Sequence, residues 1–143
     1  MHFNFHVGTS QTTLTFPISA LYRETALLIA ARRGHQGVVD LLLACGANID
    51  LANNDGVTPL MAASLFGHKD VVISLLNSGA SMFPEKTSGR TPMHYAVLSG
   101  ESQVVKALLK AGASVTVVDV FGHTPSDYAR NNDDQEIINV FLL

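Results

Sequence analysis

The sequence predicts an all-α solenoid built from about four helix-turn-helix units of 33 residues each. An alanine follows each repeated threonine five positions later. The threonines that recur with this period are Thr25, Thr58, Thr91 and Thr124. The glycines that keep the same step form two series, Gly34, Gly67 and Gly100, and Gly46, Gly79 and Gly112. Because several positions agree at one period, the signal is far more specific than a single short motif.

Each unit carries start and stop signals for a short first helix. Threonine precedes proline at Thr58 and at Thr91. The threonine hydroxyl caps free backbone N–H groups, and proline is tolerated at the first helical position because its missing N–H has no partner there. Glycine follows about nine residues later, at Gly67 and Gly100, and suits the left-handed conformation that ends a helix. We therefore expect helices between these threonines and glycines.

A second helix is predicted in each unit, with apolar residues spaced for one helical face. In the second unit these residues are Val71, Val72, Leu75 and Leu76, and Gly79 is the next stop signal. The neighbouring units repeat the pattern as Val38, Val39, Leu42 and Leu43, and as Val104, Val105, Leu108 and Leu109. Isolated helices below about 12–15 residues are marginal in water, so stacking of neighbouring units must bury this face.

The segments that begin at the repeated threonines resemble one known signature. They read Thr25-Ala26-Leu27-Leu28-Ile29-Ala30, Thr58-Pro59-Leu60-Met61-Ala62-Ala63, Thr91-Pro92-Met93-His94-Tyr95-Ala96 and Thr124-Pro125-Ser126-Asp127-Tyr128-Ala129. They resemble the Thr-Pro-Leu-His-x-Ala motif of the ankyrin repeat, whose period is also 33. The match covers about residues 20 to 143. The resemblance implies an ankyrin-repeat solenoid in which the turn segments between helix pairs form β-hairpin-like finger loops.

The sequence divides into two parts under this prediction. Residues 21–143 form the ankyrin-repeat domain, with repeats at about 21–53, 54–86, 87–119 and 120–143. Residues 1–20 contain no Lys, Arg, Asp or Glu and match the repeat poorly, so we expect an N-terminal leader that is extended or disordered. Two alternatives remain open. The leader's apolar residues cover the edge of the first repeat, or the chain is a fragment or variant of a longer array.

The first and last units depart from the repeat. Ala26 stands where proline is expected and Arg23 replaces the turn glycine, so the first finger should be irregular. Asp133 stands at the helix-ending glycine position of the last unit. The polar run 131–136 predicts a C-terminal cap, and the apolar residues that follow it should face inward. These apolar residues are Ile137, Ile138, Val140, Phe141 and Leu142.

Composition and charge weigh against several classes of function. The 9 basic and 12 acidic residues give a net charge of −3, which provides no large positive field for nucleic acid or anionic membranes. No segment approaches the ~18 consecutive apolar residues of a membrane span, and the N-terminus lacks the basic start of a signal peptide. We therefore expect a cytoplasmic or nuclear protein. Cys45 lies in an apolar run and is expected to be a small buried hydrophobe.

The six histidines raise the question of metal binding. The resemblance implies that His35, His68 and His94 are structural residues that tie neighbouring loops together by hydrogen bonds. His2 and His6 lie four residues apart but have no third ligand nearby. No histidine is paired by sequence with a nucleophile, and no phosphate-binding glycine loop or Walker lysine occurs. We expect no enzyme activity, no cofactor and no metal site.

Candidate partner-binding residues are those that the repeat does not dictate. Just before the helix-ending glycine position, the units read Arg32-Arg33, Leu65-Phe66, Leu98-Ser99 and Asn131-Asn132. Resemblance to ankyrin proteins implies that these positions line a concave groove and that finger residues form its rim. The rim residues are Tyr22, Glu24, Asn54, Asp55, Val57, Thr87, Ser88, Arg90, Phe121 and His123. Apolar residues beside arginines are typical of binding hot spots, whereas the alternative is that Leu65 and Phe66 only pack on adjacent repeats.

These observations favour a non-enzymatic protein–protein interaction module or adaptor, which binds a partner protein through the concave groove and finger loops. The alternative is a regulatory or targeting ankyrin segment of a larger enzyme or scaffold polypeptide. We expect no nucleic-acid partner and no membrane partner. We also expect a monomer, with self-association through the ends of the stack as the remaining alternative.

Overall fold

The computed structural model describes residues 2–7, 12–17, 24–85 and 87–142. Two strands, β1 (His2–Val7) and β2 (Thr12–Pro17), precede the helices. The first helices of the units are α1 (Ala26–Arg33), α3 (Pro59–Leu65), α5 (Pro92–Leu98) and α7 (Pro125–Asn131). The second helices are α2 (Gln36–Ala44), α4 (Lys69–Asn77), α6 (Ser102–Lys110) and α8 (Gln135–Phe141).

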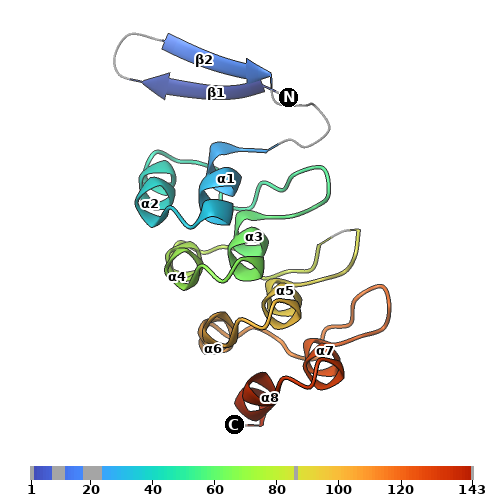
Figure 1. Cartoon of the computed structure of the whole chain (residues 1–143). Coiled ribbons are helices and arrows are strands. Elements are labelled where there is room, and N and C mark those ends of the chain that lie inside the picture. The colour runs from blue at the N-terminus through green and yellow to red at the C-terminus, as the bar shows by residue number, and fades with distance from the viewer. Residues whose placement is uncertain (1, 8–11, 18–23, 86, 143) are drawn as a thin grey trace.

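The helices form two rows of one stack (Figure 1). α1, α3, α5 and α7 contact one another in order along the first row, and α2, α4, α6 and α8 do so along the second. The finger loops, defined here as residues 51–57, 83–90 and 116–123, project on the side of the first row. The prediction of an all-helical repeat solenoid of about four units is confirmed for the repeat part of the chain.

The N-terminal strands pair as an antiparallel hairpin. Its register places His2 opposite Pro17 and Val7 opposite Thr12. Both strands fall within residues 1–20, where the sequence predicts an extended or disordered leader. Their side chains lie outside the described part of the structure. The division at residue 20, and the alternative that the leader covers the first repeat, therefore stay predictions.

A threonine caps every first helix. Thr25, Thr58, Thr91 and Thr124 have extended backbones, and each side-chain oxygen accepts a hydrogen bond from the N–H three residues later. These four bonds measure between 3.0 and 3.3 Å. Since an N-cap threonine contributes about 1 kcal/mol, the repeated threonine stabilises each unit locally. The predicted helix starts at Thr58 and Thr91 are confirmed.

The hydrophobic core lies where consecutive units stack. The repeated alanines of the first row, Ala30, Ala63, Ala96 and Ala129, are buried. In the second row Val72, Leu75, Val105 and Leu108 are completely buried, as their spacing on one helical face predicts. Burying one such valine or leucine contributes about 1.5–3 kcal/mol. Stacking of units is therefore the main source of stability that these short helices have.

Three expectations about burial are wrong. Val38 is 47 % exposed, although the matched Val71 is buried, because no helical unit precedes α1 and α2 in the described part of the chain. Leu142 is 79 % exposed because it lies just beyond the end of α8. Cys45 is exposed rather than buried. It follows Leu41 by one helical turn on the outer face of α2, and Leu41 is itself 62 % exposed.

Backbone hydrogen bonds close each finger loop. The N–H of Asn53 donates to the carbonyl of Val57, and the N–H of Asp119 donates to the carbonyl of His123, at 3.0 Å in both cases. In the finger 83–90 the matching bond joins Glu85 to Arg90 at 2.7 Å and encloses one more residue. No strand is present in the described finger residues, so the β-hairpin-like geometry stays a prediction.

Asp133 adopts the left-handed conformation that glycine adopts in the other units. Its φ is 54°, against 75° for Gly34 and 73° for both Gly67 and Gly100. Among the described non-glycine residues it alone has a positive φ. The helix-ending position therefore keeps its conformation in the last unit despite the change of residue. An aspartate pays a steric penalty there that glycine avoids.

We predict that Asp133→Gly raises the free energy of unfolding by about 0.5–1 kcal/mol, because glycine adopts this conformation without strain. Urea unfolding followed by far-UV circular dichroism measures the change. The control is Asn132→Gly, because Asn132 has an ordinary φ of −86°. Glycine at residue 132 should leave stability unchanged or lower it. An equal gain in both variants would contradict the assignment of strain to Asp133.

Candidate partner-binding surface

The residues just before the helix-ending position lie along the C-terminal ends of the first-row helices. In each of the first three units one of the two is exposed, namely Arg33, Phe66 and Ser99. Phe66 leaves 52 % of its surface in solvent. The half-buried members are Arg32, Leu65 and Leu98. In the last unit Asn131 and Asn132 are both exposed.

The first unit uses two predicted binding residues internally. The Arg32 guanidinium forms an ion pair with the carboxylate of Glu24. The Arg32 carbonyl accepts a hydrogen bond of 2.7 Å from Nε2 of His68, which ties the first unit to the second. The Phe66 ring stacks near the His68 ring, with 6.5 Å between centroids. Tyr22 lies outside the described residues.

The finger 51–57 has a polar tip. Oδ1 of Asn53 accepts hydrogen bonds of 3.0 Å from the N–H groups of Asp55 and Val57, which fixes the loop. Asn54 and Asp55 are exposed, and Val57 is half-buried. The tip therefore presents an amide and a carboxylate to solvent.

A buried carboxylate organises the finger 83–90. Glu85 is 6 % exposed and accepts hydrogen bonds from Ser88 Oγ at 2.5 Å and from the Tyr95 hydroxyl at 2.9 Å. Burial by itself raises the pKa of Glu85, but these hydrogen bonds outweigh it and hold the pKa below its ordinary value of 4.5. Burial and the bond to Glu85 raise the pKa of Tyr95 to about 12. Thr87 is exposed at the tip.

Asp119 has the same function in the finger 116–123. It is 5 % exposed, and the Tyr128 hydroxyl donates to its Oδ2 at 2.5 Å. Its Oδ1 accepts bonds of 3.0 Å from the N–H groups of Phe121 and His123. Burial alone raises the pKa of Asp119, but these hydrogen bonds hold the pKa below its ordinary value of 3.8.

Arg90 joins the two fingers. Its Nε lies 3.6 Å from Oδ2 of Asp119, and its guanidinium lies 5.8 Å from the ring centroid of Phe121 and 5.7 Å from that of Tyr128. The N–H of Val120 also donates to the carbonyl of Ser88 at 2.9 Å. Ser88, Arg90 and His123 thus make contacts within the chain. Their role in binding a partner stays a prediction.

The fingers expose apolar side chains that the sequence reasoning missed. Phe83 is 81 % exposed, and Val120 and Phe121 are 61 % and 66 % exposed. Leu51 and Val118 are also exposed. Of these five, only Phe121 was predicted as a rim residue. The signal was available in the sequence, because a turn needs glycine, asparagine or aspartate but does not need a large apolar residue.

An open groove separates the fingers 51–57 and 83–90. Its volume is about 540 Å³. Leu51, Met61 and Phe83 contribute apolar lining, and Asp50 and Glu85 contribute carboxylates. Asp50 also accepts a hydrogen bond of 2.9 Å from the N–H of Ser81, which fixes the wall of the groove between neighbouring units. The groove therefore combines an apolar lining with a fixed polar edge.

Two of the histidines have structural roles. His94 is completely buried, and its Nδ1 accepts the N–H of Thr91 while its Nε2 donates to the carbonyl of His123, each at 3.0 Å. Burial lowers the pKa of His94, which favours the neutral ring that this bonding pattern requires. His68 links two units as described above, so the role implied for His68 and His94 is confirmed. The described residues contain no group of three His, Cys, Asp or Glu that could hold a metal ion.

Comparison with known families identifies the repeat. A family model described as Ankyrin repeats (3 copies) matches residues 6–86, 27–119 and 81–143. The chain belongs to the ankyrin-repeat family. A comparison with curated proteins gives no match. None of the helices in the described part of this ankyrin-repeat chain is long and apolar enough to cross a membrane.

Ankyrin repeats are generally protein–protein interaction modules, and the family is typically non-catalytic. In this ankyrin stack the threonines, alanines and glycines recur because the scaffold needs them. Arg33, Phe66 and the exposed finger residues differ from unit to unit, so the scaffold does not explain them. They are the candidate binding residues.

We predict that Asp119→Asn lowers the free energy of unfolding at neutral pH by about 1 kcal/mol, because the charged acceptor of the Tyr128 hydroxyl is lost. It should also reduce the acid sensitivity of the protein. The pKa of Asp119 is lowered in the folded chain, so its ionised form stabilises the fold above pH 3.8, and this contribution is lost as pH falls through the lowered pKa.

Urea unfolding at about pH 7 and about pH 3 measures both effects. Asp55→Asn is the matched control, since it removes an exposed finger carboxylate with the same change of charge. The control should behave like the unmodified chain at both pH values. If Asp119→Asn loses as much stability on acidification as the unmodified chain does, Asp119 does not have this role.

Proposed function

We propose that this ankyrin-repeat chain is a non-enzymatic adaptor of the cytoplasm or nucleus that binds a partner protein through its concave groove and finger loops. The observation that carries the proposal is the set of exposed apolar side chains on the finger side of the stack. These are Leu51, Phe66, Phe83, Val118, Val120 and Phe121. Exposed apolar groups gathered on one side of a protein are typical of interaction sites.

The energetic argument rests on the three phenylalanines. Phe66, Phe83 and Phe121 each leave more than half of their surface in solvent. Covering one such side chain contributes roughly 1.5–3 kcal/mol, and aromatic residues commonly dominate the binding energy of interfaces. The exposed part of each ring lowers the solubility of the free chain and adds no buried apolar surface to its core. A partner that covers them explains why they are present.

Charge near these residues suggests the chemistry of the partner. Arg33 is exposed at the end of α1, and Phe66 occupies the matched end of α3. A partner segment with an acidic end and an apolar middle would pair its carboxylate with Arg33 and cover Phe66. The groove between the fingers would accept a second apolar side chain against Leu51 and Phe83.

We predict that affinity capture from cell extract recovers a partner that is lost when the chain carries Arg33→Glu together with Phe66→Ala. Phe121→Ala alone should weaken capture of the same partner, because it removes an exposed aromatic ring from a finger tip. Quantitative mass spectrometry of the captured proteins measures both effects. Circular dichroism first establishes that all variants fold alike.

The control for this experiment is Leu41→Ala. Leu41 is 62 % exposed but lies on α2, in the second row of helices. Leu41→Ala tests whether the loss of any exposed apolar side chain reduces capture of the partner. We expect capture to be unchanged. Capture that survives the groove and finger variants but is lost with Leu41→Ala would place binding on the other side of the stack and refute the proposal.

A further inference from the structure

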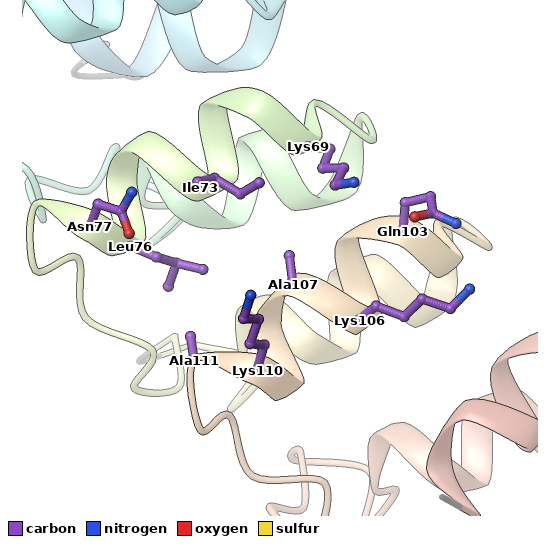
Figure 2. Close-up of a pocket in the computed structure, with 9 residues that line it drawn as sticks. All are labelled: Lys69, Ile73, Leu76, Asn77, Gln103, Lys106, Ala107, Lys110 and Ala111. Carbon is purple, nitrogen blue, oxygen red and sulfur yellow. The ribbon is translucent and has the colours of Figure 1, made fainter.

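The second-row helices α4 and α6 border a groove on the side of the stack away from the finger loops (Figure 1, Figure 2). Its volume is about 490 Å³. The residues that line it are Lys69, Ile73, Leu76, Asn77, Gln103, Lys106, Ala107, Lys110 and Ala111. Figure 2 shows the two helices running in the same direction. Lys69 begins α4 at one end of the groove, and Lys110 closes α6 at the other.

The charge of this groove is opposite to that of the whole chain. Three of the four lysines in the sequence line it, although the net charge is −3. No carboxylate is among the described lining residues. Lys106 Nζ lies 3.7 Å from Oε1 of Glu136, but both side chains are substantially exposed, so this surface pair contributes little. The corresponding groove between α2 and α4 is lined by Asp40 and by no described basic residue.

The repeat requires neither these lysines nor the apolar residue between them. The positions one unit away from Lys69 hold Gln36 and Ser102, and the position one unit before Lys110 holds Asn77. Ile73 is apolar, whereas the residues at the matched position of the other three units are polar. These residues are Asp40, Lys106 and Asn139. Since the scaffold accepts polar residues at these places, stability of the stack does not explain this combination.

The floor of the groove is apolar. Ile73 is 37 % exposed, and Leu76 and Ala107 are half-buried beside it. Lys69 and Lys110 lie at the two ends of this apolar strip, and Lys106 lies within α6 (Figure 2). At 1.5 Å per residue, the two ends of these helices lie about 12 Å apart. That spacing suits several carboxylates along a segment better than one phosphate group.

We propose that the groove between α4 and α6 binds an acidic amphipathic segment of a partner protein. Carboxylates of the segment pair with Lys69 and Lys110, and its apolar side chains cover Ile73. An amphipathic helix that places apolar residues on one face and acidic residues beside them fits this arrangement. The surface is separate from the concave groove and finger loops, so the proposal does not depend on the function proposed above.

The test uses the full chain and a fluorescein-labelled peptide of about twelve glutamates and leucines, with leucines at the i, i+3 and i+4 spacing of one helical face. Fluorescence anisotropy should show binding that weakens as salt is raised. Lys69→Glu and Ile73→Asp should each weaken binding several-fold, and the double variant roughly tenfold or more. Both variants should fold, because glutamate is favoured at a helix start and Asp40 already occupies the matched position in the first unit.

The matched control is Arg130→Glu, which reverses a basic charge at an exposed residue of α7 that belongs to neither proposed binding surface, and it should leave peptide binding unchanged. A peptide with serines in place of leucines should bind more weakly. The proposal is overturned if the unmodified chain does not bind the peptide, or if Arg130→Glu weakens binding as much as Lys69→Glu. It is also overturned if binding of phosphatidylserine vesicles requires Lys69 but binding of the peptide does not. Sedimentation showing a dimer that Lys69→Glu dissociates would assign the groove to a second copy of the chain.

Discussion

Burial of apolar faces between consecutive repeat units is the constraint on which the rest of the structure depends. Each unit has two helices of seven to nine residues, which are too short to be stable alone. Val72, Leu75, Val105 and Leu108 are completely buried only because a neighbouring unit lies against them. The threonine caps and left-handed stops make each unit the same shape, so that this burial can be repeated.

A scaffold of this kind leaves much of its surface unconstrained. Each unit contacts only its neighbours, so residues outside the stacking faces can differ from one unit to the next without loss of fold. The exposed apolar residues of the fingers lie on one side of the stack, and the lysines of the α4–α6 groove lie on the other. The two surfaces differ in chemistry, which gives the chain the means to contact two separate segments of protein.

Much of the fold was predictable because its signals are local and repeat at one period. Thr58 and Thr91 start helices as expected, and even Asp133 keeps the conformation of the glycine that it replaces. The contacts between fingers were not predictable. Glu85 and Asp119 have the same function but do not occupy matched repeat positions, so comparison of the units does not reveal them. Cys45 was misassigned because an apolar run does not show which face of α2 meets the next unit.

The central claim is that exposed apolar side chains of the fingers, such as Phe83 and Val120, contribute little to the stability of the fold and are available to a partner. The most direct test is the free energy of unfolding of Phe83→Ser and Val120→Ser beside that of Val105→Ser, which is matched in type but completely buried. The finger variants should change it by less than about 0.5 kcal/mol, whereas Val105→Ser should lower it by about 3 kcal/mol. If the finger variants cost as much as Val105→Ser, these residues hold the fold together and the account is wrong.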